Sequence, residues 1–300
     1  MKLATTTGDF GRYTRHQPQA IEWIAESGFR YVDYNFHNDY SKRNGILGHD
    51  YRRYIDELKA VAEKCGVKIV QAHAPIGNPF MEAGNALADA TILSVKACAE
   101  LGIKDLVLHS AYAPGLSKEE TIEKNKAFYM PILREAEQYD VCILTENLYK
   151  MTDPNVFWID NARDLLELIE YVDHPLFHAV WDTGHANMQD IPQDESIRLL
   201  GRHLRGLHVN DNFGEVDSHI PPYFGTMNLD SLMHGLSDIG YDGYFTFEAF
   251  NFFGGLPNPK RKYEADKRLE LPDLQTRKKA EDLLYEIGKN ILSAYQCFKI

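Results

Sequence analysis

Asp182 and His185, two residue types that can bind metal ions or transfer protons, stand three positions apart in segment 180–187, which reads VWDTGHAN. The mostly apolar run from Phe177 to Trp181 predicts a buried strand that ends at Asp182, and a glycine turn then leads to His185. A carboxylate and an imidazole just past such a strand suit a divalent cation or acid–base catalysis. Asp-Thr-Gly also occurs in ordinary turns, so this segment alone indicates only a polar site at a strand end.

The same arrangement recurs along the chain, because other apolar runs also end in a histidine or a carboxylate. These further residues are His73, His109, Glu146, His208 and Glu248. A single histidine at a strand end is more often a hydrogen-bonded rim residue, and this reading applies to His73 and His109 taken singly. Coincidence is harder to accept for the residues that end four consecutive predicted strands, namely Glu146, Asp182, His208 and Glu248.

Short β-rich apolar runs alternate eight times with helical patterns. The predicted strands are Lys2–Thr6, Arg30–Tyr34, Lys68–His73, Asp105–His109, Val141–Glu146, Phe177–Asp182, Gly206–Val209 and Tyr244–Glu248. The predicted helices are Gln19–Ser27, Tyr51–Cys65, Asn85–Leu101, Lys118–Tyr139, Ala162–Tyr171, Gln193–Leu200, Leu229–Ile239 and Leu271–Phe298. Eight such units predict an α/β fold, a (β/α)8 TIM barrel. A doubly wound sheet is the competing fold, but segment 7–11, TGDFG, is a weak match to its Gly-rich phosphate turn.

We predict a single barrel domain over residues 1–300, because no linker rich in Pro, Gly or Ser divides the chain. Several predicted helices are followed by a glycine suited to a left-handed cap, at Gly28, Gly66, Gly102 and Gly240. Two loops are longer than a connection needs, Asn35–Asp50 and Asn251–Pro272. Both follow strands, which places them on the face where barrel enzymes have their active sites, and we expect them to cover a ligand.

In a closed barrel the strand ends form a ring, so the polar residues that end the strands meet in one pocket. Burying several carboxylates and imidazoles together without a cation costs several kcal/mol per unpaired charge. We therefore predict one divalent metal ion, Mn²⁺, Mg²⁺, Co²⁺ or Zn²⁺, bound by Glu146, Asp182, His208 and Glu248. His185 and Asp211 are assigned to substrate contacts or to support of the ligands. Asp217 and His219 are either a further metal pair or anchors of a rigid loop.

Composition argues against several classes of protein. The net charge of −12 counts against nucleic acid as a partner, because such binding depends on Lys and Arg. No apolar run approaches the roughly 20 residues that cross a bilayer, and the N-terminus lacks the apolar core of a signal peptide. The four cysteines are widely spaced with no CxxC pair. We expect a reduced, cytoplasmic protein without a membrane anchor.

The runs TEN at 145–147, WDTGHAN at 181–187 and HVNDN at 208–212, followed by Asp217, His219 and Phe247-Glu248, resemble the xylose-isomerase-like TIM-barrel superfamily. That superfamily holds sugar isomerases and epimerases, inosose dehydratase and endonuclease IV. The resemblance covers essentially the full length. It implies that the four residues above are metal ligands, that Glu146 and Glu248 also form an acid–base pair, and that His185 contacts substrate.

Two departures from the ketose epimerases limit what the resemblance implies. Those enzymes carry a glutamate where this chain has Thr152 and an arginine where it has Gly214, so 3-epimerase specificity does not follow. In endonuclease IV, additional zinc ligands would match His73, His109, His185, Asp217 and His219. The patterns around these residues also resemble sugar-acting members, so they discriminate poorly.

We therefore expect a metal-dependent sugar isomerase or epimerase that acts on a ketose or polyol-derived substrate by proton transfer through an enediolate. The alternatives are a dehydratase of the inosose type on the same site, a zinc phosphodiesterase acting on abasic DNA, and a non-catalytic sugar-binding subunit. His73 and His109 are grouped with the substrate-binding residues, and Phe36 and Phe250 are expected to stack on a sugar ring. Other aromatic side chains on this face could pack a subunit interface, so a homo-oligomer is expected.

Overall fold

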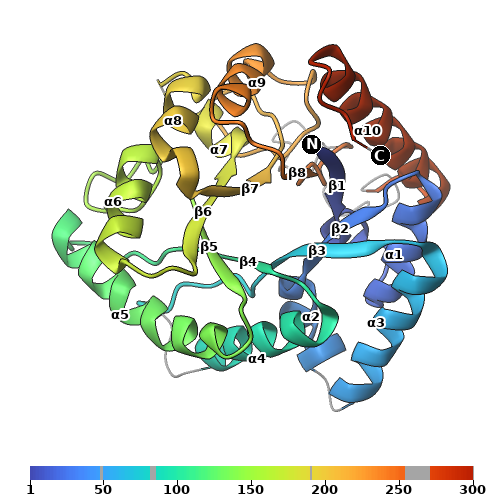
Figure 1. Cartoon of the computed structure of the whole chain (residues 1–300), viewed down its shortest axis with the longest axis horizontal. Coiled ribbons are helices and arrows are strands. Elements are labelled where there is room, and N and C mark those ends of the chain that lie inside the picture. Colours follow the sequence, from blue (N-terminus) through green and yellow to red (C-terminus); the bar gives the residue numbers. More distant parts are fainter. Residues whose placement is uncertain (48–49, 82–85, 190, 254–270, 300) are drawn as a thin grey trace, which may run out of the picture.

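The computed structural model describes residues 1–47, 50–81, 86–189, 191–253 and 271–299. Eight parallel strands form the ring at the centre of Figure 1, in the order β7-β6-β5-β4-β3-β2-β1-β8. They are β1 (Lys2–Thr6), β2 (Tyr31–Asn35), β3 (Lys68–His73), β4 (Asp105–Leu108), β5 (Cys142–Glu146), β6 (Phe177–Asp182), β7 (Leu204–His208) and β8 (Tyr244–Phe247). The ring closes just past β7, where the Val209 amide donates to the carbonyl of Thr246 (2.7 Å). The prediction of a (β/α)8 TIM barrel is confirmed.

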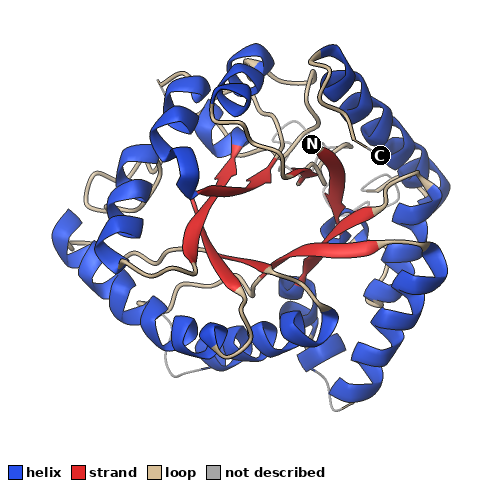
Figure 2. Cartoon of the chain, in the orientation of Figure 1, coloured by secondary structure: helices blue, strands red, loops and turns tan. Residues whose placement is uncertain are grey.

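Helices surround the ring on its outer side (Figure 2). They are α1 (Gln17–Glu26), α2 (Phe36–Lys42), α3 (Tyr51–Cys65), α4 (Ala86–Leu101), α5 (Lys118–Glu137), α6 (Ala162–Val172), α7 (Thr183–Asn187), α8 (Gln193–Leu200), α9 (Leu229–Asp238) and α10 (Leu274–Ala294). In the described part of the chain, the short 3₁₀ helices η1 to η3 cover Thr7–Phe10, Gly45–Leu47 and Gly201–His203. The chain ends meet beside β1 and α10, where the Lys299 amide donates to the Met1 carbonyl (2.8 Å). Within the described ranges, no helix combines the length and apolar character needed to cross a membrane.

Helix boundaries follow from local chemistry. Ser117 and Glu120 form a capping box that begins α5, since each side chain accepts a hydrogen bond from the backbone amide of the other. Gly66 ends α3 with φ at 63°, the left-handed conformation that glycine adopts at little cost. The other three predicted cap glycines also have positive φ, as expected.

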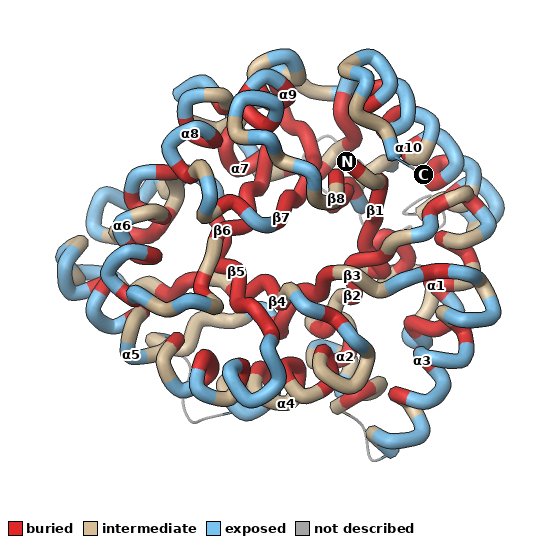
Figure 3. Tube along the Cα trace, in the orientation of Figure 1, coloured by how far each residue is buried: buried red, intermediate tan, exposed pale blue. Residues whose placement is uncertain are grey.

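Most strand residues are buried, as the ring of buried backbone in Figure 3 shows. All five residues of β5 are buried, and its side chains alternate between the barrel interior and the surrounding helices. Val107, Cys142, Leu144 and Val180 form a small separate apolar cluster. Leu144 lies on the same side of β5 as Glu146, so this packed apolar layer supports the polar residues at the strand end.

One predicted loop has regular structure. Segment Asn35–Asp50 contains α2 and η2, because the Asn35 side chain accepts from the Asn38 amide (3.0 Å) and begins a helix directly after β2. The second predicted loop, Asn251–Pro272, lies mostly outside the described residues, which omit 254–270. That either segment covers a ligand stays a prediction, as does the single domain over 1–300.

Asp39 on α2 gives a test of this local structure. Its fully buried carboxylate accepts hydrogen bonds from Gln17 and the Tyr34 hydroxyl, both at 2.8 Å, and burial raises its pKa to about 6. Because this carboxyl binds its proton more tightly in the folded than in the unfolded protein, the stability that Asp39 contributes falls as pH rises from about 4 to 6. Two pKa units correspond to about 3 kcal/mol. We expect the unfolding free energy of wild type relative to Asp39→Asn to fall by up to that amount across this window. Urea unfolding between pH 4 and 7.5 measures it, and parallel pH profiles would contradict it.

Candidate metal centre and active site

A cavity of about 920 Å³ opens at the carboxyl ends of the strands. It lies where the active sites of barrel enzymes form. The histidines and carboxylates that line it on the side of β3 to β8 are His73, His109, Glu146, His185, Asp217, His219 and Glu248. Asp182 and His208 are not among the lining residues and are fully buried. Glu146 and Glu248 are therefore the two predicted ligands that also reach the cavity.

The four predicted metal ligands come together at this end of the barrel. They follow one another around the ring, at the ends of β5, β6 and β7 and just past β8. One ligand atom from each of the four lies within 4.8 Å of those of the others. His208 Nδ1 lies close to two carboxylates, 3.1 Å from Glu146 Oε1 and 3.5 Å from Glu248 Oε2.

The donor set fits a divalent cation. Three carboxylates and one imidazole are buried together, an arrangement that is unfavourable unless a positive charge compensates it. Asp182 Oδ1 accepts a hydrogen bond from the His185 amide and Oδ2 accepts one from Asn210 Nδ2, each at 2.7 Å. Each oxygen therefore keeps a further lone pair that can bind an ion. Oxygen-rich ligation with one imidazole suits Mn²⁺, Mg²⁺ or Co²⁺ and also admits Zn²⁺. Metal ligation by these residues stays a prediction.

The Asp-Thr-Gly segment is shaped by this site. Asp182 caps the N-terminus of α7, which begins immediately after β6. A Cβ atom on Gly184 would lie 1.8 Å from Asn210 Oδ1, so only glycine fits beside that amide. Because Asn210 in turn holds the Asp182 carboxylate, the glycine contributes to positioning a candidate ligand.

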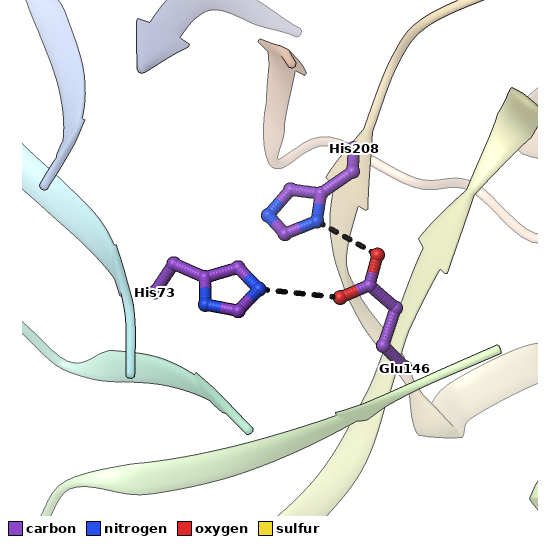
Figure 4. A group of neighbouring side chains, drawn as sticks. All are labelled: His73, Glu146 and His208. Atoms are coloured by element: carbon purple, nitrogen blue, oxygen red, sulfur yellow. Dashed lines mark hydrogen bonds and ion pairs between the residues drawn. The ribbon is translucent and has the colours of Figure 1, made fainter. Parts of the chain in front are cut away.

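Two further histidines contact Glu146 from the other side. His109 Nε2 lies 3.1 Å from Glu146 Oε2, and His73 Nε2 lies 3.6 Å from the same oxygen (Figure 4 shows His73, Glu146 and His208). His73 Nδ1 is 2.8 Å from the Ala74 carbonyl, which fixes that nitrogen as the donor and turns Nε2 toward the site. Although burial opposes ionisation, His208 and these histidines hold the pKa of Glu146 well below its usual range, whereas burial raises the pKa of Glu248.

Asp217 joins His185 and His219 in a second cluster. Nδ1 of His185 faces the Asn147 carbonyl (2.8 Å), and Nδ1 of His219 faces the Glu248 carbonyl (2.9 Å). Both Nε2 atoms consequently point at Asp217 Oδ2, at 3.2 and 3.1 Å. Burial opposes the charged form of each histidine, but Asp182 and Asp217 outweigh it at His185 and raise that pKa to about 10, and Asp217 outweighs it at His219 and raises that pKa to about 9. Such a cluster accommodates either imidazolium ions or a further cation.

The sequence matches the family described as xylose isomerase-like TIM barrel over residues 21–269. The chain belongs to this family. A 2-oxo-tetronate isomerase of Haemophilus influenzae is 28% identical over 237 residues, covering 75% of this chain and 84% of that protein. An uncharacterized protein of Methanocaldococcus jannaschii is 28% identical over 165 residues. That match covers 53% of this chain and about half, 55%, of that protein.

A solved structure has the same fold. The D-psicose 3-epimerase of Clostridium cellulolyticum H10, solved with D-tagatose, superposes with a TM-score of 0.74 at 18% identity. The superposition covers 97% of this chain and 99% of that structure. At this identity the likeness shows the fold alone. The curated relatives of this family member include sugar isomerases and epimerases.

Two residues predicted to contact substrate lie elsewhere. Phe36 is fully buried in the hydrophobic core, where its ring packs 4.8 Å from that of Tyr34, and it does not line the cavity. The carboxylate of Asp211 accepts from the backbone amides of Gly225 (3.0 Å) and Met227 (2.9 Å), so it holds a loop together. Phe250 does line the cavity, and its ring stacks on His219 at 4.6 Å.

Several residues of the site were not predicted from the sequence. Asp33 and Gln71 contact His208 inside the barrel, and Arg12, Lys42, Tyr149 and Trp158 line the cavity. Asp33 and Gln71 stand in the middle of apolar strands, where a polar side chain is a signal of an interior contact. The cavity residues of the first two βα loops carry no comparable signal in a single sequence.

Proposed function

We propose that this protein is a divalent-metal-dependent sugar isomerase or epimerase that acts on a ketose or polyol-derived substrate. One observation carries the proposal. Among the four candidate ligands, Glu146 and Glu248 alone also line the cavity, and both lie close to His208 Nδ1, at 3.1 and 3.5 Å. Two carboxylates at the surface of one cavity suit removal of a proton from a carbon atom and its return. The named activities of the 2-oxo-tetronate isomerase and D-psicose 3-epimerase relatives support this reading.

In the proposed reaction, one glutamate accepts the proton from the carbon next to the substrate carbonyl. The other glutamate returns a proton, and the position of the carbonyl decides whether isomerisation or epimerisation results. A divalent ion bound by Glu146, Asp182, His208 and Glu248 would supply Lewis acidity that polarises the carbonyl. His185 and His219 keep Nε2 directed toward the cavity by anchoring Nδ1 on backbone carbonyls. Phe250 offers an aromatic face to the apolar side of a sugar ring.

The direct test is deuterium exchange. The Mg²⁺-loaded protein is incubated in D₂O with a panel of ketoses, 2-oxo sugar acids, ketoglycosides and inososes. We expect loss of the proton signal next to the carbonyl of at least one substrate, with appearance of its isomer. A loaded, folded protein that exchanges no proton in any member of the panel would overturn the proposed function.

The histidine–aspartate cluster favours a second candidate, a multinuclear zinc phosphodiesterase. Asp182, His185 and His219 each offer a ligand atom, and these atoms lie within 4.8 Å of one another. His73, Glu146 and His208 form another such group. The net charge of −12 opposes binding to a phosphate backbone.

Metal content separates the two candidates. We expect one tightly bound divalent ion per chain after saturation with Mn²⁺ or Zn²⁺ and removal of excess, because the four-residue site has the largest buried negative charge. Elemental analysis of the dialysed protein measures the ratio. Three zinc ions per chain, together with cleavage of abasic DNA, would favour the phosphodiesterase instead.

A further inference from the structure

Below the candidate metal ligands, a buried acid–amide pair contacts His208. Asp33 on β2 and Gln71 on β3 are 1% and 4% exposed, and neither lines the cavity. We propose that Asp33 is a positioning residue. As the acceptor beside Nε2, it keeps the proton of the His208 ring on that nitrogen against the competing Gln71 donor, and so leaves Nδ1 free to bind the cation. The inference rests on the proposed function only in requiring a cation at the four-residue site.

The two ring nitrogens of His208 face different surroundings. Nδ1 points toward the Glu146 and Glu248 carboxylates, at 3.1 and 3.5 Å, which is where a cation would be held. Nε2 points the other way, 3.3 Å from Asp33 Oδ2 and 3.0 Å from Gln71 Nε2. Only Nδ1 is therefore in a position to bind an ion shared with the two glutamates.

A neutral imidazole has one N–H group and one lone pair, so binding a metal through Nδ1 requires the proton to sit on Nε2. That proton needs an acceptor, and Asp33 Oδ2 is the one at hand. Gln71 Nε2 donates to the same oxygen (2.7 Å) and cannot accept. Without the carboxylate, the second hydrogen of Gln71 Nε2 would instead donate to Nε2 of the ring. The proton would then sit on Nδ1, where it prevents metal binding.

The backbone is shaped to bring these groups together. β2 and β3 pair Val32 with Ile69 and then Asp33 with Gln71, so one residue of β3 is passed over. This irregularity places Gln71 directly beside Asp33. On β7, a Cβ atom at Gly206 would lie 2.8 Å from Gln71 Oε1, so glycine leaves the room that the amide occupies.

Metal affinity of the folded protein tests the inference without substrate. Outer partners of metal-bound histidines typically contribute about 10- to 100-fold to affinity. We expect Asp33→Asn to raise the Kd for Zn²⁺ by that factor in competition titrations with a chromogenic chelator. The matched control is Asp39→Asn, the same change at a buried aspartate that contacts none of the candidate ligands, and its Kd should stay within about twofold of wild type. Equal affinity of Asp33→Asn and wild type overturns the inference.

A second measurement does not depend on the variant folding. Long-range ¹H–¹⁵N correlation spectra of the histidine rings, with His208 assigned by comparison with His208→Gln, report which nitrogen carries the proton. We expect His208 of Zn²⁺-loaded wild type to carry it on Nε2 with Nδ1 bound to the ion, and a proton on Nδ1 overturns the inference. Failure of the proposed function alone gives a different result. The protein would then still bind Zn²⁺ in an Asp33-dependent manner but would convert no sugar.

Discussion

Replacing Glu146 by glutamine is expected to lower kcat by about 10²- to 10⁴-fold, the range typical for loss of an acid–base group. The change keeps the size of the side chain and removes its ability to take up a proton. Glu146 is 1% exposed but lines the cavity, so the lost group is one that substrate reaches. The measurement is the initial rate with a substrate identified by deuterium exchange, at a metal concentration that saturates the variant.

Metal binding of Glu146→Gln is measured alongside the rate, because Glu146 is also a candidate ligand. The amide oxygen still has lone pairs, so a weaker but measurable affinity is expected. The control is Asp39→Asn, whose carboxylate lies outside the cavity, and it should keep a rate close to that of wild type. A metal-saturated Glu146→Gln protein with more than half of the wild-type rate would exclude Glu146 as an acid–base residue.

The position of the site followed from the sequence because of a property of parallel barrels. The carboxyl ends of all strands meet at one face, so a residue that ends a strand needs no further information to be placed there. Glu146, Asp182 and His208 each end a strand and Glu248 comes directly after one, so a boundary error of one residue did not matter. The resemblance added which of the polar residues to group as ligands.

The orientation of side chains in the post-strand segments could not be predicted in this way. Phe36 and Phe250 both follow a strand, yet Phe36 begins a helix that turns its ring into the core, whereas Phe250 remains at the cavity. Asp211 looked like a site residue because it follows His208 closely. A bridge between Asp211 and Ile220 folds the loop back, and the carboxylate is used on loop amides.

The orientation of the histidine rings also could not be predicted from the sequence. His73, His185 and His219 each place Nδ1 beside a backbone carbonyl and present Nε2 to the site. His208 does the reverse and presents Nδ1, because Asp33 and Gln71 occupy the space at Nε2. Those two residues come from strands far away in the sequence, and the β-irregularity that aligns them has no pattern in the residues themselves.

Replacing Glu248 by glutamine is expected to separate proton exchange from conversion, if the substrate is epimerised. Glu248 lines the cavity as Glu146 does, and its Oε2 lies 3.5 Å from His208 Nδ1. In a two-base reaction each glutamate serves one epimer as the proton acceptor. Glu248→Gln should therefore lower conversion by about 10²- to 10⁴-fold and still exchange the proton of the epimer that Glu146 serves.

Proton spectra of both epimers in D₂O, recorded on aliquots quenched with EDTA, measure exchange and conversion separately. Glu146→Gln is the matched partner and should show the mirror pattern, exchanging only the other epimer. A single acid–base group predicts instead that one variant loses exchange of both epimers while the other loses neither. Complementary loss in the two variants would assign a separate proton-transfer role to each glutamate. Metal ligation alone does not produce that pattern, because loss of a shared ligand lowers exchange of both epimers equally.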